Sequence, residues 1–291
     1  MDENVDIVVP WVNPNDAIWR SSFEFWNKNE NGDKDPCRFR DLGTFPFWFR
    51  SVEKNCNWFN KIILVLSNKS QIPKWLNINN PKLKIVYHDE FIPTDELPTF
   101  NAFVINCYLP FINFISEKYI LFNDDFFVVK PILKESFFNK DCIVGKYMDD
   151  KMVPVSEWEH SIQNGYDLFT KTTGIKIHYR PDHGPIPHLK SIDLFVWNKL
   201  KVELTSALES SKFRKPKNIS DWFFFGFYFS LNKAISGRSL TQYYNNCDNY
   251  NSEKEIYCFN DNETIKNFDD FKIRVVSFLE KNFKDKSSFE V

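Results

Sequence analysis

Two adjacent carboxylates, Asp124 and Asp125, lie between apolar stretches in the segment YILFNDDFFVV. Burying unpaired carboxylates is costly, so such groups require a cation, a positive side chain or solvent. Carboxylates at the end of a strand are natural ligands for Mg²⁺ or Mn²⁺ that is bound to substrate phosphates. The alternative is an ordinary turn after a strand, where Asn and Asp are common. The segment therefore predicts a metal site or a turn.

A second candidate is the segment RPDHGPIPH, residues 180–188, which holds two of the five histidines and three prolines. A histidine on such a stiff loop can act as a general base towards a sugar hydroxyl, and His183 is our candidate. The other reading is a structural loop that carries a surface histidine.

Two further segments carry polar groups. SKFRKPKNISDW, residues 210–222, gathers Arg214 and three lysines ahead of a predicted helix, which suits a phosphate, although a solvated charged loop would look the same. In CFNDNE, residues 258–263, Asn260 and Asp261 could add metal ligands or form a turn.

These segments need a scaffold, and the first half of the chain predicts one. Apolar runs alternate with amphipathic stretches, which favours an α/β domain with a mostly parallel sheet. Ligands of such sheets bind at the carboxyl ends of strands, here after the first strand at Trp11–Asn13 and after the fourth at Asn123–Asp125. The predicted strands are 6–12, 61–66, 84–88 and 119–122, and the predicted helices are 16–28, 44–55 and 101–115, the last interrupted at Pro110.

The second half predicts mainly helices, at 191–210, 220–231 and 269–283. We expect one catalytic domain over residues 1–291. Its α/β part (1–150) would bind the nucleotide-sugar, and a mainly helical part (180–291) would cover one side of the sheet and complete the site.

Composition excludes several classes of protein. The formal net charge is −2, and without a basic excess we expect no nucleic-acid partner. None of the six cysteines forms a CxxC pair, so a zinc ribbon is not expected, and a Cys247–Cys258 bridge would require an oxidising compartment. The N-terminus lacks the pattern of a signal peptide, and no run of 18 apolar residues exists. We expect a cytoplasmic protein without a membrane span that could work at the inner face of the plasma membrane.

Taken in order, these segments resemble the four conserved regions of the Stealth proteins. DIVVPWVNPND is similar to the first region, and the stretch from Arg38 to Pro131, with RFRD, PKWL, LPTFNA and NDDFF, is similar to the second. HGPIPHLKS and FRKPKNIS resemble the third region, and CFND followed by a helix and KSSFE resembles the fourth. The resemblance covers nearly the whole chain.

The family includes bacterial capsular polysaccharide phosphotransferases and the catalytic part of the eukaryotic N-acetylglucosamine-1-phosphotransferase. The resemblance implies a nucleotide-sugar-transferase-like (GT-A-like) fold and transfer of a hexose- or N-acetylhexosamine-1-phosphate that depends on Mg²⁺ or Mn²⁺. The donor would be a UDP-sugar such as UDP-GlcNAc, and the acceptor a hydroxyl of a capsule or other surface glycan. Peripheral association with a capsule-synthesis complex fits this expectation.

The resemblance also implies roles for individual residues. It places Asp124, Asp125 and Asp261 at the metal, with His183 rather than His188 as the base and Arg214 at the donor phosphates. Asn13 and Asn218 stand where many relatives carry Asp. The residues expected to bind substrate are Trp11, Asn13, Asp16, Asp41, Arg50, Thr99, Asn101, His188 and Asn218.

Two rival functions share these residues. A metal-dependent glycosyltransferase would release a nucleoside diphosphate, whereas a phosphotransferase would release a nucleoside monophosphate. An inactive sugar- or nucleotide-binding protein would bind the donor without turnover.

Overall fold

The computed structural model describes residues 4–148, 154–176, 180–209, 211–244, 250, 252–262 and 264–291. Its main sheet has the strand order β3-β2-β1-β4-β9, in which β1 to β4 are parallel and β9 is antiparallel to β4. The predicted α/β fold with a mostly parallel sheet is confirmed. The strands are β1 (Val5–Pro10), β2 (Ile62–Leu66), β3 (Leu83–Tyr87), β4 (Lys118–Leu121) and β9 (Ile186–Leu189).

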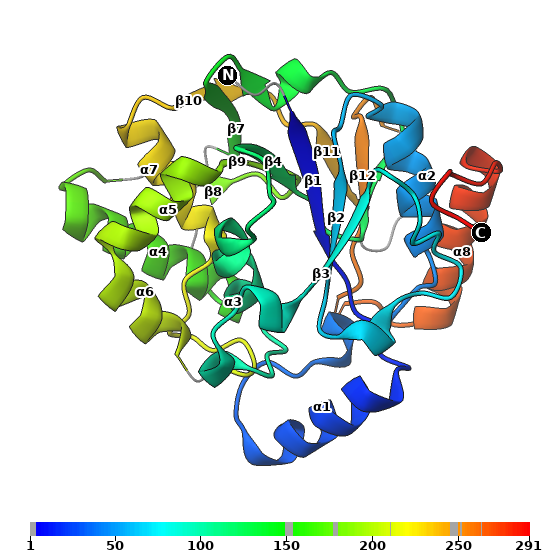
Figure 1. The fold of residues 1–291 in the computed structure, drawn as a ribbon, viewed down its shortest axis with the longest axis horizontal. Coiled ribbons are helices and arrows are strands. Elements are labelled where there is room, and N and C mark those ends of the chain that lie inside the picture. The colour runs from blue at the N-terminus through cyan, green and yellow to red at the C-terminus, as the bar shows by residue number, and fades with distance from the viewer. Residues whose placement is uncertain are drawn as a thin grey trace.

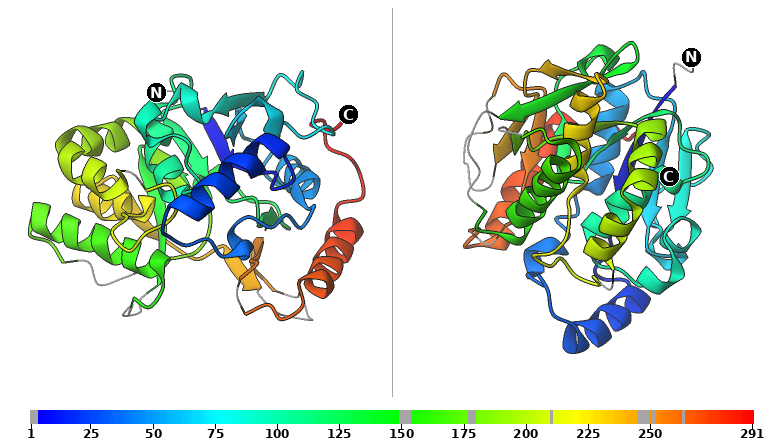
Figure 2. Two further views of the ribbon diagram at one scale, coloured as in Figure 1. Left: turned by 90° about the horizontal axis from the view of Figure 1, so that it is seen from below. Right: turned by 90° about the vertical axis from the view of Figure 1, so that its left-hand side faces the viewer.

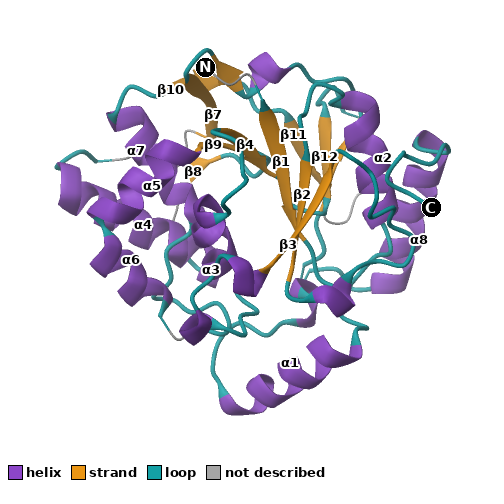
Figure 3. Ribbon diagram, viewed as in Figure 1, coloured by secondary structure: helices purple, strands orange, loops and turns teal. Residues whose placement is uncertain are grey.

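Helices lie on two sides of this sheet (Figures 1 and 3). On one side are α2 (Phe45–Asn55) and α8 (Phe268–Asn282), and on the other are α3 (Ala102–Tyr108), α4 (Glu157–Thr173), α5 (Lys190–Lys199), α6 (Lys201–Leu208) and α7 (Phe224–Ser230). Central strands are buried on both faces, and every residue of β2, IILVL, is buried. Helix α1 (Ala17–Asn29) lies apart from both groups, below the carboxyl ends of the first strands (Figure 2).

A second, three-stranded sheet has the order β11-β12-β5. Its strands are β5 (Phe126–Val128), β11 (Thr241–Tyr244) and β12 (Ile256–Phe259), and β12 is parallel to β11 and antiparallel to β5. A third sheet is formed by β6 (Phe138–Asn139), β7 (Cys142–Met148) and β10 (Ala234–Gly237), with β8 (Arg180–Pro181) pairing with β7.

The predicted elements of the first half are confirmed, with two local differences. The first strand ends at Pro10 instead of residue 12. Helix α3 ends at Tyr108, and a short 3₁₀ helix (Leu109–Phe111) follows because Pro110 has no N–H to continue the α-helix.

In the second half the predicted helices are confirmed, but the strands between them were not predicted. Strand β9 joins the main sheet, and β8 and β10 to β12 pair with one another or with β5 and β7 in the smaller sheets. The predicted helix 191–210 is two helices, α5 and α6, that meet at Leu200. Within the described residues, no helix is both long enough and apolar enough to cross a membrane.

Candidate functional site

The carboxyl ends of β1 and β4 bring the two predicted ligand positions to one edge of the sheet. The strands are parallel neighbours, with Val8 paired to Leu121. Strands β2 and β3 continue from β1 in one direction, and β4 lies in the other, so this edge is a topological switch point. Trp11–Asn13 and Asn123–Asp125 therefore leave the sheet side by side, where ligands of such folds bind.

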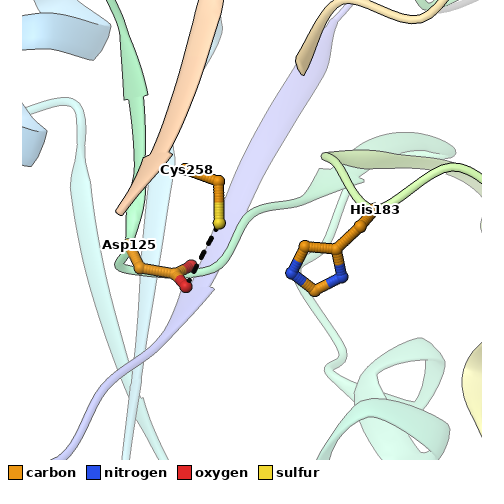
Figure 4. Close-up of side chains that lie close together, drawn as sticks. All are labelled: Asp125, His183 and Cys258. Atoms are coloured by element: carbon orange, nitrogen blue, oxygen red, sulfur yellow. Dashed lines mark hydrogen bonds between the residues drawn. The ribbon is translucent and has the colours of Figure 1, made fainter. Parts of the chain in front are cut away.

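Beyond the end of β4, three side chains from distant segments converge. One ligand atom from each of Asp125, His183 and Cys258 lies within 4.8 Å of the other two. The Asp125 carboxylate and the His183 ring point toward one another, and the Cys258 thiol lies beside the carboxylate (Figure 4). Cys258 Sγ and Asn260 Nδ2 each donate to Asp125 Oδ2 over 3.5 Å. Asp125 Oδ1 is buried and has no hydrogen-bond partner among the described residues, so this oxygen suits a cation.

The small sheet holds this cluster in place. Cys258 on β12 pairs with Phe126 on β5, the residue that follows Asp125. The backbone N–H of Phe259 donates to the Asp125 carbonyl over 3.1 Å. On the other side, Trp48 Nε1 of α2 donates to the Asn123 carbonyl over 3.1 Å. The acidic pair thus sits on a short, fixed connection between β4 and β5.

Aromatic rings surround His183. Its ring is edge-on to those of Phe126, Trp158 and Tyr243, with centroid distances of 5.3, 5.9 and 5.4 Å. Contacts with three rings from three different elements restrict the tilt of the imidazole, which helps to fix its position beside Asp125.

Burial changes the protonation of the acidic pair. The pKa of Asp124 is raised to about 8, mainly by burial and further by the negative charges of Asp125 and Asp41. Burial raises the pKa of Asp125 to about 6. The pKa of the Cys258 thiol is also raised, by burial and by Asp125, so it remains a protonated donor to the carboxylate instead of a thiolate ligand. Two neighbouring carboxylates fit Mg²⁺ or Mn²⁺, and the protonated thiol does not favour a soft metal.

The metal-free protein is expected to lose stability as the pH rises from about 5 to about 8.5. In the unfolded chain both carboxyls have ordinary pKa values near 3.8, whereas in the folded chain the values are raised. The folded state therefore keeps protons that the unfolded state has lost, and ionisation above these values destabilises it. Thermal unfolding in chelator should show a melting temperature that is lower at the higher pH.

Mn²⁺ should reverse this loss and raise the melting temperature more at pH 8.5 than at pH 5, because it replaces the bound protons. The control is the double variant Asp124→Asn/Asp125→Asn, in which both effects should shrink. A metal-free melting temperature that rises over this interval equally in both proteins would contradict the assignment.

Two arginines, Arg214 and Arg38, lie near one another, and Arg38 is close enough to Tyr243 to affect its pKa. The Arg214 guanidinium stacks over the Phe103 ring at 4.8 Å and makes no hydrogen bond or ion pair with any described residue. Burial and the neighbouring Arg38 lower its pKa to about 10. Arg38 forms an ion pair with Asp33 over 2.8 Å. Its positive charge also acts to lower the pKa of the Tyr243 hydroxyl. A partly buried guanidinium without a partner favours an anion such as phosphate.

Sequence reasoning missed Arg38 and Arg40. Arg40 binds Asp261 through two hydrogen bonds of 2.5 and 2.7 Å, so the charge of Asp261 is already balanced within the protein. The only signal for either arginine was the RFRD motif of the second region, of which Asp41 was singled out. Asp41 accepts from the Gly43 N–H and lies close enough to Asp124 to raise its pKa.

Several predicted substrate residues are occupied by contacts that hold the fold. Arg50 binds Glu290 over 2.6 and 2.8 Å and donates to the Phe283 carbonyl, which ties α2 to the segment after α8. Asn101 Nδ2 donates to Asn218 Oδ1 over 2.9 Å, and both residues are fully buried. The Thr99 hydroxyl accepts from the Asn101 N–H. The structure does not bring these side chains into the cluster around Asp125.

His188 is also part of the interior. It is 1% exposed, stacks on Tyr119 at 4.8 Å, and its Nδ1 lies 3.2 Å from Asp193 Oδ2 and 3.0 Å from the Tyr228 hydroxyl. Tyr119 donates to Asp193 over 2.6 Å. This network joins β4, β9, α5 and α7, so His188 supports the sheet next to the site while His183 lies within it.

The first motif shapes the edge of the sheet. The Trp11 ring stacks on Phe45 at 4.9 Å, and Asp16 caps α1 by accepting from the Trp19 N–H. The Asn13 N–H donates to Gln71 Oε1 over 2.6 Å. Trp11, Asn13 and Asp16 thus each make a contact that shapes the chain here. The Asn13 side chain lies near the carboxyl end of β1.

The lysines beside Arg214 are held by other groups. Lys212 donates to the carbonyls of Asp95 and Leu97, and Lys217 donates to those of Ser206 and Glu209. Of this predicted basic cluster, Arg214 is the residue that remains for a phosphate. Cys258 is a free thiol, and Cys247, its predicted bridging partner, lies outside the described residues.

Comparisons with known proteins agree with this arrangement. Residues 38–145 match the model of "Stealth protein CR2, conserved region 2". The chain is 30% identical to the capsular polysaccharide phosphotransferase WcwK of Streptococcus pneumoniae, over the whole length of both proteins. The chain belongs to the Stealth family. Other relatives are the receptor polysaccharide phosphotransferase WefC of Streptococcus gordonii, 31% identical over both full lengths, and the capsular polysaccharide phosphotransferase eps5J of Streptococcus thermophilus, 42% identical over 46% of this chain and 57% of that protein.

Among solved structures, this Stealth protein aligns with the galactosyltransferase LgtC in complex with donor and acceptor sugar analogues. That alignment covers 94% of this chain and 95% of the other at 8% identity, with a TM-score of 0.45.

Proposed function

We propose that this protein transfers a sugar-1-phosphate from a nucleotide-sugar, a UDP-sugar in the first instance, to a hydroxyl of an acceptor glycan during the synthesis of capsule or another surface polysaccharide. The observation that carries the proposal is the partly buried acidic pair Asp124–Asp125 beside the His183 imidazole. Arg214, which has no hydrogen-bond or ion-pair partner among the described residues, lies near Arg38, whose charge in turn reaches Tyr243 at the site. The acidic pair and the guanidinium suit a metal-bound diphosphate, and the imidazole suits an attacking hydroxyl. The full-length relatives are named polysaccharide phosphotransferases, which supports transfer of a phosphate-containing group.

In this proposal Asp125 and Asp124 hold Mg²⁺ or Mn²⁺, which when bound balances charge on the phosphate oxygens. Arg214, which lies near Arg38, binds a phosphate oxygen through N–H groups that have no partner among the described residues. His183 accepts the proton of the acceptor hydroxyl. The acceptor oxygen forms a bond to the phosphorus that carries the sugar, the bond from that phosphorus to the bridging oxygen breaks, and the nucleoside monophosphate leaves.

The product decides between phosphoryl and glycosyl transfer. The protein would be incubated with Mn²⁺ or Mg²⁺, a panel of UDP- and GDP-sugars and methyl glycosides as acceptors, and the released nucleotide identified by chromatography. We expect a nucleoside monophosphate together with a phosphodiester-linked product, and neither from the Asp125→Asn variant. A nucleoside diphosphate would replace the proposal with glycosyl transfer, and donor binding without turnover would indicate a binding protein.

A further inference from the structure

An aromatic side chain that the proposed reaction does not use lies beside its proposed base. In the three-stranded sheet, Tyr243 pairs with Cys258, which in turn pairs with Phe126. Side chains that pair in register point to the same face of a sheet, so these three form a row across it. The His183 ring contacts both ends of this row, Phe126 at 5.3 Å and Tyr243 at 5.4 Å. The sheet is thus the floor of the site beneath His183.

Tyr243 differs from its neighbours in this row by being exposed. Phe126 is 2% exposed and Cys258 is fully buried, whereas Tyr243 is 40% exposed. Burial, together with the negative charge of Asp125, raises the pKa of the Tyr243 hydroxyl, so the ring is a neutral phenol. Its position next to the imidazole and the carboxylate leaves an apolar surface open where a substrate must approach.

The position of Tyr243 indicates which substrate would cover it. A base that removes the acceptor's proton must touch the acceptor, and Tyr243 contacts the proposed base His183 directly. The donor's phosphates are assigned to the metal and to Arg214, whose ring contact is with Phe103 instead. Aromatic rings bind flat apolar surfaces and leave polar edges free, and the C–H face of a pyranose presents such a surface with its hydroxyls at the rim.

We propose that Tyr243 is the stacking platform for the acceptor sugar and thereby sets which acceptor hydroxyl reaches His183. This inference rests on the proposed function. The acceptor class is a pyranoside with one unsubstituted C–H face, and the ring, not the phenolic hydroxyl, supplies the binding surface.

Steady-state kinetics of Tyr243→Phe and Tyr243→Leu test the platform, with the methyl glycoside that gives product in the wild type. Tyr243→Phe keeps the ring and should keep the acceptor KM within about 3-fold. Tyr243→Leu should raise the acceptor KM about 10-fold. The donor KM should not change in either variant, because the donor phosphates are assigned to the metal and to Arg214. Phe195→Leu on α5 is the matched control, because Phe195 is also half-exposed, at 46%, and lies outside the site.

An unchanged acceptor KM in Tyr243→Leu would overturn the inference, and so would a rise in the donor KM alone. Should Tyr243→Leu fail to fold, saturation-transfer NMR on the wild type provides the test, with transfer expected from protein aromatic protons to the C–H protons of one glycoside face. Absence of that transfer with a turned-over glycoside would also overturn it. Failure of the proposed function is distinguishable, because the wild type would then release a nucleoside diphosphate or no nucleotide.

Discussion

Replacement of Asp125 by asparagine is expected to lower kcat by at least about 10³-fold while the fold survives. The substitution keeps the shape of the side chain and removes the charge from Oδ1, the buried oxygen without a partner among the described residues. In the metal-free protein it should even be neutral or stabilising, since burial raises the pKa of this carboxyl to about 6 and ionisation there is unfavourable. Catalysis and stability should therefore change independently.

Three measurements on the purified variant would check this expectation: turnover, circular dichroism and Mn²⁺ binding by calorimetry. Asp89→Asn is the matched control, because Asp89 is exposed and follows β3 outside the site. A folded Asp125→Asn protein with full activity or unaltered Mn²⁺ affinity would exclude the metal assignment.

Replacement of His183 by glutamine is expected to lower kcat by about 10²–10⁴-fold, the contribution of a general base. The donor KM should change little, because the imidazole is assigned to the acceptor and not to the phosphates. Steady-state kinetics with donor and acceptor varied separately would check both expectations.

The parallel variant His188→Gln separates the two histidines. His188 lies in the buried network with Asp193 and Tyr228, so this variant should lower the melting temperature, and its folded fraction should keep most of its turnover. A folded His183→Gln protein with nearly full kcat, or a His188→Gln protein that is stable but inactive, would reverse the assignment.

The scaffold could be predicted because its signal is local. Strands such as β2 are continuous apolar runs that are buried on both faces, and Asp124 and Asp125 follow another such run directly. The small sheet gives no comparable signal. Strand β5 has three residues and β11 and β12 have four each, too few for a pattern to distinguish from a loop, and pairing across the chain defines them.

The side chains of the site also divide into those that the sequence could predict and those that it could not. His183 and Arg214 could be proposed from their motifs, because their types and neighbours suit the chemistry. Arg50 and Asp261 have equally suitable types, but Glu290 and Arg40 bind them, and only the tertiary fold brings those partners near. Tyr243 could not be predicted from its type or its neighbours in sequence. Only the tertiary fold, which brings its ring next to His183, indicates a role for it.

The pairing of β5 with β12 also bears on how the molecule is made. Val128 pairs with Ile256, so the two strands meet only after 128 further residues have been added. Contacts this distant in sequence form late and slow folding. On the ribosome, β5 would have an unpaired edge until β12 arrives, which favours association with other nascent chains. A chaperone that covers the β5 edge should therefore increase the yield of soluble protein.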